Sequence, residues 1–197
     1  MKILIESQFL APIQYFNGLF IYDKIILDDL EIFKKQSYRN RAKIAGPNSV
    51  QALIIPLKQG KTHLKTSQVI IDYSTRWQSE HWKSICSAYG KAPFFEHYAH
   101  HFAPHFTRRT ELLWEFNLEL LYTCMRILKI PKEKIILLSE NTSDNFIDLR
   151  NQVHPKKEIS SEDLISLPQP YIQTFMERTG YIPNLSILDL IFNKGSW

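Results

Sequence analysis

Two arginines stand two positions apart in the stretch Lys35-Gln36-Ser37-Tyr38-Arg39-Asn40-Arg41. If this stretch forms a β-strand, its side chains alternate between faces, so Arg39, Arg41 and Lys43 share one face. Three neighbouring cations either face open solvent or bind an anion. Two guanidinium groups at this spacing suit a carboxylate or a phosphate. The stretch therefore predicts an anion-binding pocket, with a solvated basic face as the alternative.

Two carboxylates, Asp28 and Asp29, follow the apolar segment Lys24–Leu27. Ligands of open α/β sheets gather beyond the carboxyl ends of the strands, which makes these aspartates and Gln8, after the first expected strand, interesting by position. Asp28 and Asp29 could act as a base or hold a divalent cation. A turn or cap role is more common for such a pair, because a hard-cation site usually needs further oxygen ligands.

Histidines are concentrated in residues 94–106. His97 and His101 are four residues apart, which is the helical spacing of two metal ligands. His105 lies beyond a proline and leaves that face, and no HExxH sequence is present. Partly exposed histidines between aromatic core residues account better for this pattern, so we predict no metal site.

Several common chemistries have no motif in this chain. It contains only six glycines and no GxxxxGK[ST], GxGxxG or GxSxG sequence. A Walker-type ATPase, a dinucleotide-binding Rossmann enzyme and a serine hydrolase of the nucleophile-elbow type are therefore not expected. Any phosphate binding must rest on Arg and Lys side chains and on helix N-termini. The sequence predicts no particular cofactor.

The composition indicates one globular domain over residues 1–197. The net charge of +4 is spread along the chain without a basic arm, so we expect no nucleic-acid partner. No apolar run approaches the ~20 residues of a membrane span, and the first residues are too short an apolar stretch for a signal peptide. Cys86 and Cys124 are too far apart for a CxxC motif and fall on predicted helices, which favours buried thiols. We therefore expect a cytoplasmic protein without membrane insertion.

The first part of the chain has the pattern of an α/β protein. A strand at 2–6, a helix from Pro12 to about Tyr22 and a strand at 24–27 predict a βαβ-like unit. The turn Gly46-Pro47-Asn48-Ser49 then predicts a β-hairpin whose first strand carries the cations and whose second strand, residues 50–56, is buried.

The middle third is predicted to be helical. Ser74 or Thr75 caps a helix that contains His81-Trp82, where a structural tryptophan is the default, and Thr110 caps a longer helix to Lys129. A strand at 135–138, an extended segment from Ser139 packed over the domain and a final helix at 186–193 complete the chain. We predict the α/β class, with α+β as the alternative, and one mixed sheet.

Several segments resemble the WbqC-like family over nearly the whole chain. They comprise Gln8…Pro12…Tyr15-Phe16, Leu27-Asp28-Asp29, Lys35 to Arg41, His81-Trp82…Ala88-Tyr89…Ala92-Pro93-Phe94-Phe95, and the tail from Pro183 to Gly195. The segments Asp148-Leu149-Arg150, His154-Pro155-Lys156-Lys157, Pro170-Tyr171 and Gln173-Thr174-Phe175 look like the shorter form typical of Bacteroidetes. Longer members carry a Gly-rich segment before the tail that this chain lacks, which puts in doubt any substrate contact that segment supplies.

The resemblance implies a role in building or modifying sugars, because some family members are encoded among genes for O-antigen and other surface polysaccharides. A transfer of an acyl or aminoacyl group onto an activated amino sugar is the hypothesis that follows. Arg39 and Arg41 would then hold a small anionic ligand such as a phosphorylated or nucleotide-linked sugar. The other site candidates are Gln8 and Tyr15 for orienting polar groups, Asp29 with Asp28 as base or metal ligand, Asn193 for closing the site, and Lys35, Gln36, Asn40, His81 and Trp82 for further substrate contacts.

Two other interpretations remain open from the sequence. The same basic pocket could belong to a binding or scaffold protein without chemistry. Alternatively, Arg39 and Arg41 could form a structural network with Asp28, Asp29 or Asp189, which buried charges tolerate only with full hydrogen bonding.

Overall fold

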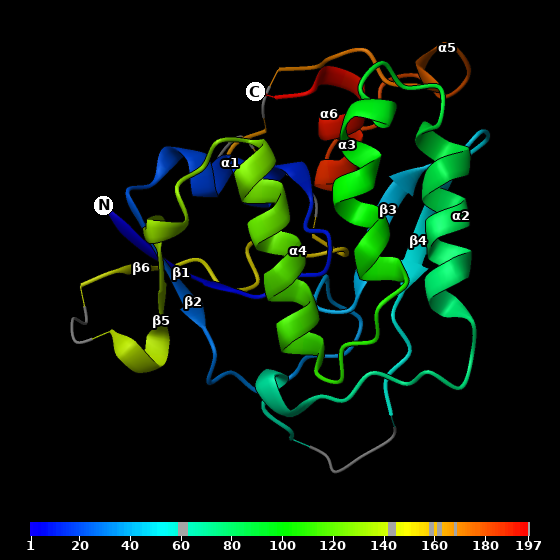
Figure 1. Cartoon of the computed structure of the whole chain (residues 1–197). Helices are drawn as coiled ribbons and strands as arrows, with labels where there is room; N and C mark the ends of the chain where they lie inside the picture. Colours follow the sequence, from blue (N-terminus) through cyan, green and yellow to red (C-terminus); the bar gives the residue numbers. More distant parts are fainter. Residues whose placement is uncertain (59–62, 142–144, 158–159, 161–162, 168, 197) are drawn as a thin grey trace.

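The computed structural model of the chain describes residues 1–58, 63–141, 145–157, 160, 163–167 and 169–196 (Figure 1). It confirms the α/β class. Parallel and antiparallel pairings occur in two separate sheets and not in one mixed sheet. In Figure 1 the parallel strands lie on one side of the long helix α4, and the hairpin with α2 and α3 lies on the other.

The main sheet contains four parallel strands in the order β5-β2-β1-β6. β1 (Lys2–Glu6) pairs with β2 (Lys24–Asp28), so Glu6 lies opposite Asp28. β2 also pairs with β5 (Ile135–Leu137), and β1 pairs with the two-residue strand β6 (Ile147–Asp148). The chain leaves β1 toward β2 and returns on the other side of β1 as β6. The crevice between β1 and β6 is therefore the topological switch point of this sheet.

The helix α1 (Ile13–Ile21) joins β1 to β2 and confirms the expected βαβ-like unit. Its last turn leaves carbonyl groups without partners inside the helix, and a cation from a distant segment satisfies them. Lys134 Nζ donates to the carbonyls of Leu19, Phe20 and Tyr22 at 3.1, 3.1 and 2.8 Å. This contact fixes the end of α1 against the segment that leads into β5.

The predicted hairpin is present as β3 (Arg41–Ala45) and β4 (Val50–Ile54). Two details of the prediction were wrong. The strand starts only at Arg41, because Gln36 has a left-handed backbone (φ 58°) and Ser37 Oγ closes a turn on the carbonyl of Lys34 at 2.7 Å. β4 is mostly exposed, and only Leu53 within it is buried.

The helices of the described chain are α1, α2 (Trp77–Tyr89), α3 (Phe95–Phe102), α4 (Leu113–Ile127), α5 (Met176–Thr179) and α6 (Ile187–Lys194). Short 3₁₀ turns lie at Thr66–Gln68, Ala103–Phe106, Lys132–Lys134 and Leu138–Glu140. The final helix agrees with the prediction and ends at Gly195, which has φ 87°. Its N-cap is Ser186, whose side chain accepts a hydrogen bond from the Leu188 backbone at 3.4 Å.

The caps predicted for the two central helices were wrong, because other groups hold those residues. α2 starts at Trp77, since Ser74 is held by Asp72, whose carboxylate accepts from the Ser74 backbone and hydroxyl, both at 2.9 Å. α4 starts at Leu113 and not after Thr110, because Leu112 forms a β-bridge with Ile70.

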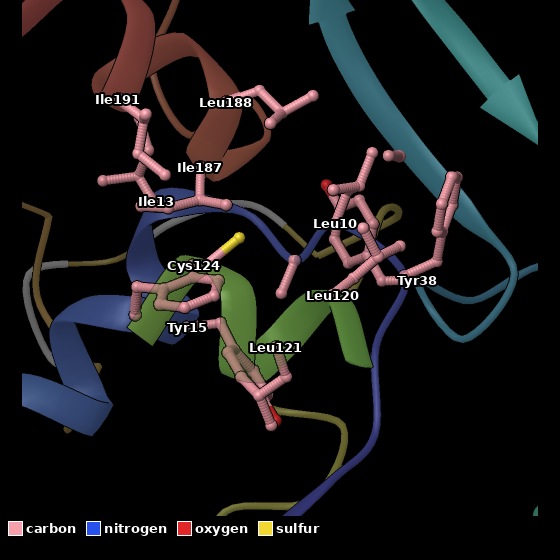
Figure 2. Packing of buried hydrophobic residues seen from close by; sticks show 14 of the residues in the cluster. Leu10, Ile13, Tyr15, Tyr38, Leu120, Leu121, Cys124, Ile187, Leu188 and Ile191 are labelled. Carbon is pink, nitrogen blue, oxygen red and sulfur yellow. The ribbon is translucent and has the colours of Figure 1, made fainter. Parts of the chain in front are cut away.

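The core is built where α1, α4 and α6 meet. Figure 2 shows Tyr15 of α1 close to Leu121 and Cys124 of α4, and Ile13 of α1 close to Ile187 and Ile191 of α6. Leu120 of α4 lies beside Leu10 and Tyr38. Cys124 is buried, as predicted, whereas Cys86 is only half-buried; both thiols are free and lie on helices. Within the described residues, no helix is both long enough and apolar enough to cross a membrane.

The extended segment that was expected from Ser139 is described only in part. Residues 142–144, 158–159, 161–162 and 168 of that segment lie outside the described residues. The described part contains the short strand β6, which the sequence pattern did not predict. The backbone N–H of Leu149, just after β6, also donates to the carbonyl of Leu4 in β1 at 2.9 Å. This hydrogen bond continues the pairing between β1 and β6 by one residue.

Candidate functional site

Acidic residues end three neighbouring strands of the parallel sheet. Glu6, Asp28 and Asp148 are the last residues of β1, β2 and β6. A pocket of about 480 Å³ opens at this edge. It is lined by Glu31, Ile32, Lys34, Asp148, Arg150 and Asn151. The site therefore lies at the switch point, where open α/β sheets bind ligands.

Arg39 reaches the pocket wall and is bound there by Glu31. The guanidinium Nε donates to Glu31 Oε1 at 2.9 Å and Nη2 donates to Oε2, which makes the pair bidentate. Both side chains are buried, with exposures of 1% and 6%. Burial raises the pKa of the Glu31 carboxyl, and Arg39 opposes that shift. Arg39 thus already has a carboxylate partner before any ligand arrives.

A second arginine, Arg150, joins the ends of β2 and β6. Its Nη1 donates to the buried Asp28 at 2.7 Å, and its Nε and Nη2 donate to Asp148 at 3.0 and 2.6 Å. The hydrogen bonds from Arg150 lower the pKa of Asp148. Asp28 also accepts the backbone N–H of Leu30 at 3.0 Å. Arg150 therefore already has two carboxylate partners before any ligand binds.

A buried polar layer lies behind this wall. Glu6 accepts the backbone N–H of Asn151 at 2.9 Å and the side-chain amide of Gln8 at 2.9 Å. The same Gln8 Nε2 donates to the carbonyl of Val153 at 3.1 Å. Gln8 Oε1 is buried and has no hydrogen-bond partner in the described part of the chain. Tyr15 supports the layer from below, since its hydroxyl donates to the Glu6 carbonyl at 2.9 Å.

Two further basic groups are Lys34, in the pocket lining, and His154, which is close enough to Arg39, Glu6 and Lys34 to interact with their charges. Lys34 lines the pocket, is exposed, and its ammonium makes no hydrogen bond or ion pair with any described residue. His154 accepts the backbone N–H of Lys156 on Nδ1 at 3.2 Å, which fixes the orientation of its ring. Burial and the Arg39 charge lower the pKa of His154, while Glu6 opposes the shift. The neutral imidazole, with Nδ1 as the acceptor, therefore carries its hydrogen on Nε2 and offers an N–H donor there.

The comparisons with known proteins identify the family. The sequence profile of the WbqC-like protein family matches residues 6–168. The chain belongs to the WbqC-like family. It is also similar to an uncharacterized protein of Mycobacterium tuberculosis, Rv1507c, with 24% identity over 217 residues that cover 98% of this chain and 93% of that protein. No solved structure matches the chain.

The family match includes every residue that lines the pocket and ends before α6. Asn193, the predicted closing residue, lies outside the match and is bound to Asp189 and Thr174 within the C-terminal part.

The structure brings some predicted site residues to this edge. Gln8 is bound to Glu6, Asp28 to Arg150 and Arg39 to Glu31, although none of the three lines the pocket itself; Tyr15 donates to the Glu6 carbonyl. The side-chain carbonyl of Gln36 accepts a hydrogen bond from Lys156 Nζ at 2.6 Å, and the neighbouring Lys35 is exposed. Their roles in binding a substrate stay predictions.

Other candidates make structural contacts away from the pocket lining. Asp29 accepts the backbone and the hydroxyl of Ser139. Asn40 donates to the carbonyl of Ile55 at 2.9 Å, which holds the base of the hairpin. Arg41 begins β3, and its Nε is buried without a hydrogen-bond partner in the described residues.

The pair His81-Trp82 lies in an aromatic layer. His81 packs between Phe9 and Trp77, with ring centroids at 6.1 and 5.2 Å. Burial lowers its pKa to about 4, so the imidazole is neutral. Trp82 stacks on Phe106 with centroids 5.6 Å apart, as expected of a structural tryptophan. Neither residue lines the pocket.

Sequence reasoning did not select Glu6, Glu31, Lys34, Asn151 and His154 as site residues. Glu6 could have been found, because it ends an apolar strand in the same way as Asp28. The sequence around Glu31 and around Asn151 contains no pattern that indicates a binding site. Within the described residues, no group of three or more His, Cys, Asp or Glu side chains is arranged to hold a metal ion.

Proposed function

We propose that the chain is an enzyme of surface polysaccharide or amino-sugar modification, which transfers an acyl or aminoacyl group onto an activated sugar. The reaction would take place in the pocket at the carboxyl ends of β1, β2 and β6. Membership of the WbqC-like family supports the sugar substrate through the genes that accompany some members. The observation that carries the proposal is the pocket at the switch point, with one unpaired cation, Lys34, in its lining.

Each exposed group at this edge has a role in the proposed reaction. Lys34 binds the phosphate of the activated sugar, because its ammonium has no partner in the described protein. Asp148 and Asn151 accept hydrogen bonds from sugar hydroxyls. His154 donates from Nε2 to the acyl carbonyl oxygen while the new bond to the acyl carbon forms, and the acyl leaving group departs with the proton of the attacking hydroxyl or amine.

A second function is supported by a specific observation. Arg39 and Arg150 are already paired with carboxylates, which leaves Lys34 as the unpaired cation in the described lining. A pocket with one unpaired cation is sufficient for a non-catalytic ligand-binding or scaffold protein. The two proposals share the pocket and differ only in the role of His154.

A thermal-shift screen with inorganic phosphate, small carboxylates and nucleotide sugars tests ligand class. A ligand at ~100 times its dissociation constant stabilises the folded state by about 2.7 kcal/mol. We expect Lys34→Ala to abolish the shift and Lys91→Ala, in an exposed turn after α2, to retain it. A shift that survives Lys34→Ala would contradict the placement of the anion in this pocket.

A second measurement separates the enzyme from the scaffold. His154→Asn keeps an acceptor for the Lys156 backbone N–H but lacks the Nε2 donor. The enzyme proposal predicts unchanged sugar binding and lost transfer to that sugar. Equal transfer by the wild-type and His154→Asn proteins would contradict the role of His154 in transfer, and no transfer by either would favour the scaffold. The same proposal places the protein in the cytoplasm, in agreement with its free thiols.

A further inference from the structure

A second pocket, of about 520 Å³, lies at the carboxyl end of α4 and shares no lining residue with the pocket at the sheet edge. Its lining combines a buried part with an exposed rim of cations. The buried part includes Thr123, Met125 and Ile130, and the rim contains Arg126, Lys129 and Lys132. No Asp or Glu is among the described lining residues, so the pocket has three positive charges and no carboxylate.

The three cations of the rim form no ion pair with any described residue. Arg126 Nη2 donates to the imidazole Nδ1 of His101 at 3.4 Å, and Lys132 Nζ lies 4.4 Å from the centre of the Tyr122 ring. The ammonium of the third cation makes no hydrogen bond within the described chain. The charge of Glu140 acts on Tyr122, but Glu140 lies outside the lining. The rim therefore presents positive charge that the described protein does not neutralise.

These cations do not cap the helix on which they stand. Lysines and arginines are common at a helix C-terminus, because they bind the last carbonyls and suit the helix dipole. Lys134 does this for α1, where three carbonyls accept from its ammonium. At the end of α4, by contrast, the carbonyls of Cys124, Met125 and Arg126 accept backbone N–H groups. Capping of α4 therefore leaves the side-chain donors of the rim available for a ligand.

Lys129 occupies a backbone position that favours glycine. Its φ is 56°, and its backbone N–H donates to the carbonyl of Arg126 at 3.3 Å, while the N–H of Ile130 donates to the carbonyl of Met125 at 2.8 Å. This is the Schellman arrangement, in which the left-handed residue is usually glycine because a Cβ atom is unfavourable there. Lysine at this position carries a conformational cost that glycine would avoid, and its side chain lines the pocket.

We infer that this pocket binds a nucleoside diphosphate, with the two phosphates at the cationic rim and the base against the buried part. Arg126, Lys129 and Lys132 together supply three positive charges and N–H donors that suit phosphate oxygens. A terminal phosphate carries about two negative charges at neutral pH and an inner phosphate adds about one more, so the charges match. Met125 and Ile130 offer an apolar surface to the base.

The inferred site is additional to the proposed function. Asn117, near the beginning of α4, donates to the carbonyl of Arg39 at 2.8 Å, and Arg39 belongs to the wall of the sheet-edge pocket. Arg126 stands roughly 14 Å further along the same helix axis. Inorganic phosphate and a nucleotide sugar, which the proposed function places at the sheet edge, carry only about two negative charges. They should therefore bind more weakly at the end of α4 than a free nucleoside diphosphate.

Calorimetric titration of the full chain tests the ligand class with UDP, UDP-glucose, pyrophosphate and uridine. It uses the Lys34→Ala protein, in which the anion contact of the sheet edge is removed. We expect UDP to bind this protein at least about tenfold tighter than each of the other three probes. UDP-glucose or pyrophosphate as tight as UDP would overturn the nucleoside diphosphate as the ligand, and uridine as tight as UDP would overturn the role of the cations. Absence of UDP binding would overturn the inference and leave the proposed function intact.

Variants of the rim in the same background test the site itself. Glycine suits φ 56°, so Lys129→Gly should unfold at a temperature no lower than its parent, while its affinity for UDP falls about tenfold. Arg126→Ala combined with Lys132→Ala should abolish UDP binding. Lys194→Ala, which removes an exposed cation from the last turn of α6, is the matched control and should bind UDP as its parent does. Unchanged UDP affinity in Lys129→Gly, or an equal loss in Lys194→Ala, would overturn the inference.

Discussion

The polar edge of the parallel sheet and the aromatic layer around α2 both contain residues that the sequence selected for substrate binding. At the polar edge, Asp28 ends β2 and is bound to Arg150, and Arg39 is bound to Glu31; Arg150 and Glu31 both line the open pocket. In the aromatic layer, polar groups are enclosed by rings, as His81 is by Phe9 and Trp77. The comparison shows that a polar residue becomes available for chemistry only where the backbone arrangement leaves an opening.

The two regions also differ in how they tolerate polar atoms. At the polar edge Arg39 and Arg150 are paired with carboxylates. The side-chain oxygen of Gln8 remains a buried acceptor without a donor in the described chain. In the aromatic layer, Trp77 Nε1 and His81 Nδ1 are buried without partners in the described chain. Packing of large rings supplies the stability there, and the neutral imidazole avoids a buried charge.

The largest expected effect comes from breaking the ion pair that forms the pocket wall. Glu31→Ala leaves Arg39 buried without its carboxylate, which should destabilise the fold by about 3–5 kcal/mol. The measurement is urea unfolding followed by tryptophan fluorescence. The double variant Glu31→Leu with Arg39→Met should recover most of the loss, because it removes both charges.

An exposed ion pair sharpens this comparison. Arg108 and Glu119 form one with side-chain exposures of 64% and 36%. Glu119→Ala should change stability by no more than ~1 kcal/mol. A similar cost for Glu31→Ala and Glu119→Ala would mean that the wall pair is hydrated, and the pocket wall would then not be a buried structure.

The local elements of the fold could be predicted from the sequence. The strands at 2–6 and 24–28 are short apolar runs with breakers at their ends, and the hairpin is closed by Gly46-Pro47-Asn48-Ser49. The last helix has an N-cap and a terminal glycine within its own segment. Such signals lie within a few residues of the structure they specify, so no tertiary contact is needed to interpret them.

The pocket wall could not be predicted because distant segments build it. Glu31 is held by a β-bridge from Ile32 to Lys65 and by the Thr66 hydroxyl, which donates to its carboxylate at 3.1 Å. β6 has two residues and thus no periodicity, although it carries Asp148 into the site. Arg39 was selected as an anion-binding residue, and nothing in its local sequence indicates that a carboxylate eight residues earlier folds onto it.

The aromatic layer should lose stability in acid through His81. Its folded pKa of about 4 lies below the unfolded value near 6.5, so the folded state binds fewer protons in this window. The contribution is complete above pH ~6.5 and declines as the pH falls toward 4, reaching a loss of about 2 kcal/mol at pH 5. Between pH 7.5 and pH 5, we expect the unfolding free energy of His81→Gln to fall by about 2 kcal/mol less than that of the wild type. Parallel pH profiles would mean that His81 is hydrated and outside the layer.

A smaller effect separates a structural from a catalytic Asp29. Its carboxylate accepts the Ser139 backbone N–H at 3.0 Å and the Ser139 hydroxyl, in the manner of a helix cap. Asp29→Ala should cost about 1 kcal/mol of stability and leave sugar binding and transfer unchanged. Asp72→Ala, which loses the same two contacts to Ser74, is the matched control. Loss of transfer with normal stability would instead make Asp29 part of the reaction.

The smallest effect on stability should accompany the largest effect on binding. Lys34 is exposed and unpaired in the described chain, so Lys34→Ala should change the unfolding free energy by less than ~0.5 kcal/mol while it removes phosphate binding. Arg41→Ala is the informative partner, because Arg41 was predicted to bind the anion but starts β3 outside the pocket lining. Measured by calorimetry with the same phosphate, normal affinity for Arg41→Ala and none for Lys34→Ala would place the anion at the sheet edge. The reverse result would move the anion to the hairpin, and the polar edge would then have the same structural role as the aromatic layer.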